Sequence, residues 1–161
     1  MIASMNAERF VWRSFNEFSL HELYSVLRLR SKVFVVEQKC IYLDLDDRDE
    51  TARHLLVKQG CSLTAYVRLQ PPTTNCRSVK AERFVVEPDQ RHAGLGRRVI
   101  SELRDEIYRA YGTVEILISA QVYLEKFYRS LGFERASEEY EEYGIKHVKL
   151  RLFLGPDTAI L

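Results

Sequence analysis

A strand, a glycine-bearing turn and a helix follow one another in residues 83–99, and this arrangement constrains the chain more than any other stretch. The apolar strand ends at Pro88, and Arg91-His92-Ala93-Gly94-Leu95-Gly96 leads into the helix. Because glycine has no Cβ, the backbone there can approach a ligand closely. The first N–H groups of a helix have no partner within it and carry the positive end of its dipole. The segment therefore predicts an anion site suited to a phosphate or pyrophosphate.

Two common phosphate motifs do not fit this segment. A Walker loop needs a Gly-Lys-Ser/Thr ending, which is absent, and a Rossmann fingerprint needs a third glycine where Val99 stands. What remains is the pattern Arg-x-x-Gly-x-Gly, with Arg97 and Arg98 adding positive charge to that of Arg91. An ordinary strand-to-helix turn with solvated arginines explains these six residues equally well, so the choice depends on the rest of the chain.

Length and composition are those of an ordinary globular protein. We expect one domain over residues 1–161, because 161 residues with 46% apolar and 29% charged side chains can build a proper core. The net charge of +1 gives no field that would recruit nucleic acid or a membrane surface, and neither is an expected partner. No apolar run has the length of a membrane span, and no signal peptide is evident. Three cysteines without C-x-x-C spacing argue against disulfides and a zinc site, so we expect a cytoplasmic protein without metal.

The apolar pattern predicts an α+β fold with helices layered on a mixed sheet. Ser19 and Glu22 form a capping box, and a helix follows from about Leu20 into the Val33 region. Short strands are expected over residues 10–12, 54–58, 63–69, 79–86, 114–118 and 147–153, the last preceded by a partner strand before Tyr143-Gly144. Further helices are expected from the glycine turn to about Gly112 and over 122–131. The succession of strand, helix and strand around the glycine turn implies one parallel pair.

An acidic stretch over residues 44–50 invites a calcium interpretation, which fails. Asp44 and Asp46 occupy the first and third loop positions, but the sixth is Asp49 instead of glycine and the twelfth is Leu55 instead of glutamate. We expect a solvated loop. If it lines a site, its charge would suit a cationic acceptor.

The element order and two motifs resemble the GNAT superfamily of N-acetyltransferases. One motif is the glycine turn, and the other is Phe127-Tyr128-Arg129-Ser130-Leu131-Gly132-Phe133, which is similar to the Phe-Tyr-x-x-x-Gly-Phe segment of that superfamily. Longer segments resemble its ElaA-like branch, namely residues 29–40, 42–46, 120–124 and 140–147. The chain departs from the branch at Tyr143, where Asp is usual, at Lys146, where Pro is usual, and at Glu87, where Ser is common.

The resemblance implies a GNAT-type acyl-CoA N-acyltransferase fold and acetyl transfer from acetyl-CoA to the amine of a small molecule or protein. The glycine turn would hold the pyrophosphate, and the strand before it would pair with the pantetheine arm and polarise the thioester carbonyl through a backbone amide. The residues expected to bind CoA are Phe84, Val85, Val86, Arg91, His92, Ala93, Gly94, Leu95, Gly96, Arg97, Gln121 and Tyr128.

The resemblance also assigns catalytic roles. Tyr128 stands where the superfamily often places the acid that protonates the leaving thiolate, although a core aromatic on a helix face would look the same. Glu37 and His147 are the expected catalytic bases, since the loop after the first helix and the final hairpin border the acceptor site in this fold. His54 is a further candidate base.

Several alternatives stay open. Arg68 and Gln121 are candidates for orienting the acceptor. The alternatives to an enzyme are a non-catalytic acyl-CoA-binding or sensor module and an interaction domain with an unused loop. Nucleophilic hydrolysis is disfavoured, because the chain has no Gly-x-Ser-x-Gly elbow and no cysteine with an obvious histidine partner. A homodimer formed through exposed strand edges is also left open.

Overall fold

The computed structural model of this protein describes residues 7–156 and divides them into two compact units. Unit 1 contains residues 7–70 and 83–102, and unit 2 contains residues 71–82 and 103–156. Strand β4 (Val79–Val86) and helix α2 (Leu95–Tyr111) each contribute residues to both units. The prediction of a single domain stays a prediction.

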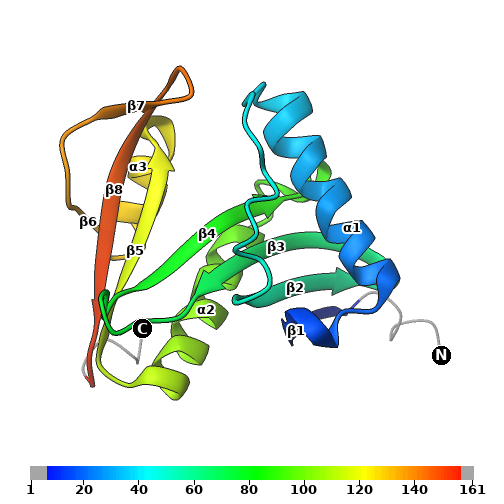
Figure 1. The fold of residues 1–161 in the computed structure, drawn as a ribbon, viewed down its shortest axis with the longest axis horizontal. Coiled ribbons are helices and arrows are strands. Elements are labelled where there is room, and N and C mark those ends of the chain that lie inside the picture. Colours follow the sequence, from blue (N-terminus) through cyan, green and yellow to red (C-terminus); the bar gives the residue numbers. More distant parts are fainter. Residues whose placement is uncertain (1–6, 157–161) are drawn as a thin grey trace. The chain divides into compact units, whose positions relative to one another are not determined.

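The sheet of unit 1 follows the chain in simple order (Figure 1). Strands β1 (Glu8–Ser14), β2 (Arg53–Gln59) and β3 (Ser62–Gln70) are antiparallel neighbours, and β4 follows β3. The β2–β3 turn contains Gly60 with φ +59°, a conformation that glycine adopts at little cost. All four strands lie where the apolar runs predict them.

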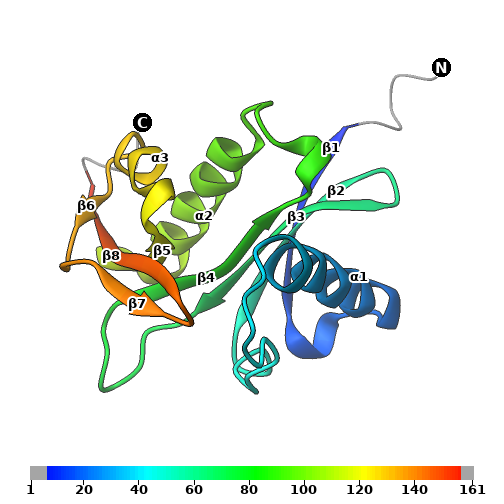
Figure 2. The ribbon, with the colours of Figure 1, turned by 90° about the horizontal axis from the view of Figure 1, so that it is seen from above.

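Helix α1 (Leu20–Arg30) covers one face of this sheet (Figure 2). Its capping box is as predicted: the Glu22 N–H donates to Ser19 Oγ at 3.2 Å, and the Ser19 N–H donates to Glu22 Oε2 at 3.0 Å. A wider π-helical segment, η2 (Ser31–Glu37), continues the helix. The core cluster under α1 and η2 comprises Val26, Leu29, Val33, Leu56, Tyr66 and Val85.

Helix α2 begins at Leu95, directly after the glycine turn, and a short 3-10 segment η3 (Pro88–Gln90) joins that turn to β4. Its apolar residues Val99, Ile100, Leu103 and Ile107 are buried. The helix ends at Tyr111, and Gly112 follows with φ +65°, the left-handed conformation expected of a C-terminal cap.

The sheet of unit 2 contains the predicted parallel pair. Val79 and Lys80 of β4 lie opposite Ile116 and Leu117 of β5 (Val114–Gln121), which pairs antiparallel with β8 (Ile145–Leu154). Strand β7 (Tyr140–Glu142) forms the predicted hairpin with β8. The two-residue β6 (Glu134–Arg135), which also pairs with β8, was not predicted because so short a run carries no alternation.

The helix predicted over 122–131 is shorter than expected. A 3-10 turn, η4 (Val122–Leu124), comes first, and α3 covers only Glu125–Arg129. A further 3-10 turn, η1 (Phe15–Glu17), follows β1. Within residues 7–156, no helix is both long enough and apolar enough to cross a membrane.

Candidate functional site

The glycine turn of unit 1 forms a tight helix start. Gly94 has φ +75°, and a Cβ placed on it would lie 3.4 Å from Arg98 Nη1. The N–H groups of Arg97 and Arg98 both donate to the Gly94 carbonyl, at 3.1 and 3.3 Å. The N–H groups of Leu95 and Gly96, the first residues of α2, are too early in the helix to have an acceptor within it. The turn therefore has the backbone arrangement of an anion site.

His92 and Ala93 lie on the exposed outer part of this turn. His92 has φ +67°, a left-handed conformation that is uncommon for a residue other than glycine. Their exposure is compatible with the predicted contact to a phosphate ligand, which stays a prediction.

Carboxylates partly neutralise the arginines of the turn. Arg91 Nη1 and Nη2 contact the two carboxylate oxygens of Glu37 at 2.6 and 2.9 Å, and Arg91 Nε donates to the Val86 carbonyl at 3.2 Å. Arg98 contacts both carboxylate oxygens of Glu8, at 2.7 and 3.0 Å. The sequence places positive charge around the turn, and the carboxylates of Glu37 and Glu8 offset part of that charge at Arg91 and Arg98.

Two ion pairs of opposite sense join η2 to the segment after β4. Lys32 of η2 pairs with Glu87, and Glu37 of η2 pairs with Arg91. The Glu87 N–H also donates to the Thr64 carbonyl of β3 at 2.8 Å. The predicted base Glu37 and the predicted phosphate ligand Arg91 are thus brought together. Each oxygen of Glu37 accepts one hydrogen bond from Arg91, and a proton taken up by Glu37 would weaken this ion pair.

The predicted pantetheine strand is the last strand of the sheet in unit 1. Val85 is buried in the core cluster under α1, while Phe84 and Val86 are half-buried. Arg83, directly before them, has φ +54° inside the strand. A left-handed residue of this kind is typical of a β-bulge and bends the strand. Phe84–Val86 come directly after this residue in the strand.

Tyr128 lies in unit 2, packed edge-on against the rings of Phe127 and Phe133 with centroids 5.1 and 5.6 Å away. Only 4% of the residue is exposed, and burial raises the pKa of its hydroxyl. The phenol is therefore protonated at neutral pH, although its proton is harder to release than that of an exposed tyrosine. Both interpretations of Tyr128 from the sequence, core aromatic and acid, fit this environment.

His147 and Gln121 are direct neighbours across β5 and β8. His147 Nδ1 lies 2.8 Å from the Ile145 carbonyl, and because a carbonyl only accepts, Nδ1 donates this hydrogen bond. The His147 ring stacks on the Tyr140 ring with the two ring centroids 6.0 Å apart, and the Tyr140 hydroxyl is hydrogen-bonded to the Ser119 hydroxyl. Sequence reasoning missed Tyr140 and Ser119, although the alternation of β5 places Ser119 on the same face as Gln121.

His54 is a structural residue instead of a candidate base. It is 1% exposed, its Nδ1 lies 2.8 Å from the Tyr66 hydroxyl, and its Nε2 lies 2.9 Å from the Asp49 carbonyl. A carbonyl only accepts, so Nε2 donates and Nδ1 accepts from the tyrosine. Burial lowers the pKa of His54, so the ring is neutral with both nitrogens in use.

The prediction that Arg68 orients an acceptor is also wrong. Arg68 is fully buried, and its two terminal nitrogens contact the two carboxylate oxygens of Asp46 at 2.6 and 2.8 Å. A third contact joins it to Asp49 at 3.0 Å. Because the side chain is fully buried, none of its surface is left for a ligand.

The acidic stretch is not the solvated loop that the sequence predicted. Asp44, Asp46 and Asp49 form ion pairs with three arginines, Arg30, Arg68 and Arg83, that come from α1, β3 and β4. Because three positive charges meet three negative ones, these aspartates supply no net attraction for a cationic acceptor. Within residues 7–156, no group of three or more His, Cys, Asp or Glu side chains is arranged to hold a metal ion.

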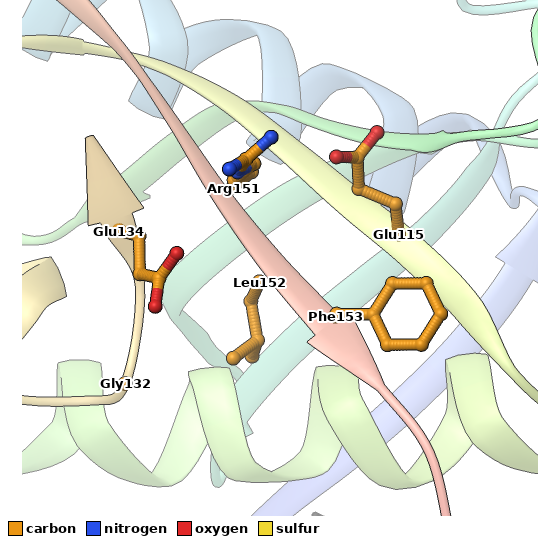
Figure 3. Close-up of a pocket in the computed structure, with 6 residues that line it drawn as sticks. All are labelled: Glu115, Gly132, Glu134, Arg151, Leu152 and Phe153. Atoms are coloured by element: carbon orange, nitrogen blue, oxygen red, sulfur yellow. The ribbon is translucent and has the colours of Figure 1, made fainter. Parts of the chain in front are cut away.

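Unit 2 contains a pocket. Figure 3 shows its lining, which consists of Glu115, Gly132, Glu134, Arg151, Leu152 and Phe153. The Ser78 hydroxyl donates to Glu115 at 2.6 Å. None of the residues predicted to bind or react lines this pocket.

Comparison with known proteins gives the family of the chain. Residues 28–154 match a family model described as an acetyltransferase (GNAT) domain. A UPF0039 protein of Schizosaccharomyces pombe is 38% identical over 152 residues, which cover 93% of this chain and 100% of the relative. The protein ElaA of Escherichia coli is 35% identical over 135 residues, covering 83% and 88% of the two chains.

Solved structures agree with the sequence relatives. The crystal structure of an acyl-CoA N-acyltransferase from Pseudomonas aeruginosa superposes with a TM-score of 0.85 at 32% identity, covering 90% of this chain and 99% of the other. The crystal structure of Escherichia coli ElaA superposes with a TM-score of 0.83 at 31% identity and the same coverage. The predicted fold and the predicted resemblance are both confirmed.

Proposed function

We propose that this chain, which belongs to the GNAT acetyltransferase family, transfers an acetyl group from acetyl-CoA to the amine of a small molecule or protein. The fold is that of an acyl-CoA N-acyltransferase. The proposal adds acetyl-CoA as the donor and an amine as the acceptor. The description of the family as an acetyltransferase (GNAT) domain supports both.

The observation that carries the proposal is the glycine turn between β4 and α2. Gly94 has φ +75°, and the Arg97 and Arg98 N–H groups close back onto its carbonyl. The free N–H groups of Leu95 and Gly96 are suited to the pyrophosphate of CoA, as helix starts bind phosphate. The adjoining Phe84–Val86 backbone is suited to the amides of the pantetheine arm, which would pair with it like an added strand.

The reaction is a direct displacement at the thioester carbonyl carbon. The amine lone pair forms the C–N bond, the carbonyl oxygen takes up negative charge, and the C–S bond then breaks to release the thiolate of CoA. A backbone amide near Val86 would stabilise the oxyanion. Tyr128 is the proposed donor of the proton that the thiolate takes, and Glu37 or His147 the proposed acceptor of the proton that the amine loses.

A titration with acetyl-CoA, read as a thermal shift, tests the proposal. Ligand at about 100 times its dissociation constant stabilises a protein by about 2.7 kcal/mol. We expect this shift in the wild type and its loss in Gly94→Asp, whose carboxylate would repel the pyrophosphate. Gly112→Asp is the matched control, because Gly112 also has a positive φ, +65°, and lies at the far end of α2.

The outcomes separate the alternatives. No shift with acetyl-CoA or free CoA would overturn the proposal and leave an interaction domain. A shift without thiol release in an amine screen would favour the sensor module. A shift that survives in Gly94→Asp would place the ligand elsewhere. Longer acyl-CoA thioesters in the same titration test the preference for acetyl.

A further inference from the structure

We propose that Arg83 is a positioning residue for acyl transfer, which fixes the bend in β4 that presents Phe84–Val86 to the thioester arm of acyl-CoA. The inference rests on the proposed function, since it concerns how the chain would hold the pantetheine part of that ligand. Arg83 need not touch the ligand. It acts through the backbone that follows it.

The backbone of Arg83 adopts a conformation that its own chemistry disfavours. Its φ of +54° lies in the left-handed region, where an L-residue with a side chain is uncommon and strained. The burial pattern of β4 departs from alternation at this residue alone: Val79, Ala81 and Val85 are buried, whereas Arg83, at the same alternate positions of the strand, is half-buried. Such a conformation persists only where surrounding contacts hold it.

The side chain of Arg83 supplies those contacts. Its Nε donates to Asp44 Oδ1 at 2.7 Å, and its Nη2 donates to the Asp44 carbonyl at 3.3 Å and to Asp46 Oδ2 at 3.1 Å. The guanidinium also lies over the Tyr42 ring, 5.2 Å from its centroid. Four contacts to residues 42–46 therefore fix one side chain at the bend, and only 19% of that side chain is exposed.

The anchor for Arg83 is itself immobilised. Asp44 accepts from Arg30 Nε at 2.9 Å, and its carbonyl accepts from Arg30 Nη2 at 2.8 Å. Asp46 is held by both terminal nitrogens of the fully buried Arg68. Asp49 joins Arg30 and Arg68 at 2.8 and 3.0 Å. The bend in β4 is thus tied to the end of α1 and to β3 through a connected network of charged groups.

The function of the bend follows from the residues beside it. Phe84, the next residue, begins the segment whose amides are proposed to pair with pantetheine and to polarise the thioester carbonyl. Rigid presentation matters there, because a displacement of about 1 Å at a reacting group can cost about 10²-fold in rate. The pyrophosphate turn begins only at Arg91, so a loosened bend should disturb the pantetheine arm and leave phosphate binding intact.

Two probes separate these halves of the ligand. Under the proposed function acetyl-CoA would contact both the turn and the strand, whereas adenosine 3′-phosphate 5′-diphosphate carries the pyrophosphate without the pantetheine arm. Arg83→Ala removes the side chain and disfavours a positive φ, and Arg83→Gly removes the same contacts but permits that φ. Far-ultraviolet circular dichroism and thermal unfolding establish that both variants fold.

We expect Arg83→Ala to weaken acetyl-CoA binding about tenfold, the loss of about two misaligned hydrogen bonds, with adenosine 3′-phosphate 5′-diphosphate unaffected. Arg83→Gly should recover part of that loss. Should Arg83→Ala fail to fold, Arg83→Gly and Arg83→Lys, which keeps the charge without the planar fork, carry the same comparison against the wild type.

The failure of the inference is distinct from the failure of the proposed function. A wild type that binds neither probe overturns the proposed function and this inference with it. A wild type that binds both, with variants that lose both probes equally or neither, overturns the inference alone. A merely structural role for Arg83 would lower the unfolding temperature without separating the two probes.

Discussion

Glu37 and Arg91 face each other with their polar atoms in register, Oε1 on Nη1 at 2.6 Å and Oε2 on Nη2 at 2.9 Å. One belongs to the helical segment after α1 and the other to the turn that precedes α2. A guanidinium fork binds carboxylate and phosphate in the same two-pronged way. A pyrophosphate at the turn would therefore compete with Glu37 for Arg91, and binding would release the carboxylate.

Replacement of Glu37 tests this competition. Glu37→Gln should tighten acetyl-CoA binding, because Arg91 is no longer held by a carboxylate. The two side chains are 37% and 33% exposed, and a surface pair of this kind contributes about 0.2–1 kcal/mol, or up to about fivefold in affinity. Isothermal titration at low salt measures the change. Glu50→Gln, an exposed glutamate of the same unit, is the control, and weaker binding in Glu37→Gln would contradict the prediction.

The buried aspartate at the centre of the charged network makes a prediction about stability. Asp49 contacts both Arg30 and Arg68, which are 1% and 0% exposed. Asp49→Asn keeps the size of the side chain but removes the negative charge that the two buried arginines share. We expect a loss of about 3–5 kcal/mol in the free energy of unfolding, measured by urea titration.

The matched control is Asp47→Asn. Asp47 is exposed, and its φ of +61° is tolerated by Asn as well as by Asp. That variant should change the free energy of unfolding by less than about 0.5 kcal/mol. Equal losses in the two variants would mean that the ion pairs of Asp49 stabilise the fold no more than an exposed aspartate does.

The sequence predicts the elements around the glycine turn well, because the signals there are local. Pro88 ends the strand, Gly94 opens the helix and Gly112 closes it, and each acts on its own backbone. The Ser19–Glu22 cap is local in the same sense. The resemblance to a family added the roles of Glu37, Tyr128 and His147, which no local signal assigns and which stay predictions.

The sequence could not predict the charged network, because the contacts within it join residues that are far apart in the sequence. Asp44, Asp46 and Asp49 look like a solvated run because their partners lie on α1, β3 and β4, far away in the sequence. The alternation of the segment is also inverted. Ile41, Leu43 and Leu45 are exposed by 90%, 77% and 52%, while Tyr42, Asp44 and Asp46 turn inward. Only the buried arginines explain that inversion.

Glu22 makes stability depend on pH. Burial alone would raise the pKa of this carboxyl, but hydrogen bonds from Lys58, the Ser19 N–H and Arg13 outweigh it and lower the pKa from 4.5 to about 2. A depressed pKa contributes stability that is complete above 4.5 and is lost as the pH falls toward about 2. The free energy of unfolding of the wild type should therefore approach that of Glu22→Gln as the pH falls through that range.

Urea titrations of both proteins at a series of pH values measure this difference. Glu50→Gln, which removes one exposed carboxylate from the same unit, again serves as the control. A constant difference between wild type and Glu22→Gln over the same range would show that the capping interactions at Glu22 do not depend on its charge.

Tyr128 distinguishes an enzyme from a binding module. Its ring packs against Phe127 and Phe133, and Tyr128→Phe keeps that packing while it removes the hydroxyl alone. If the hydroxyl protonates the leaving thiolate, the rate of thiol release with an accepted amine should fall by about 10²-fold or more. The unfolding temperature should change little, because no packed atom other than the hydroxyl oxygen is lost.

Thiol release under saturating acetyl-CoA measures the rate, and Tyr24→Phe, which alters an exposed tyrosine on α1, is the control. Because burial raises the pKa of Tyr128, the hydroxyl stays protonated through the neutral range, so the rate of the wild type should not fall there from its ionisation. An unchanged rate in Tyr128→Phe would make this residue a core aromatic, and the thiolate would then have to take its proton from another group or from water.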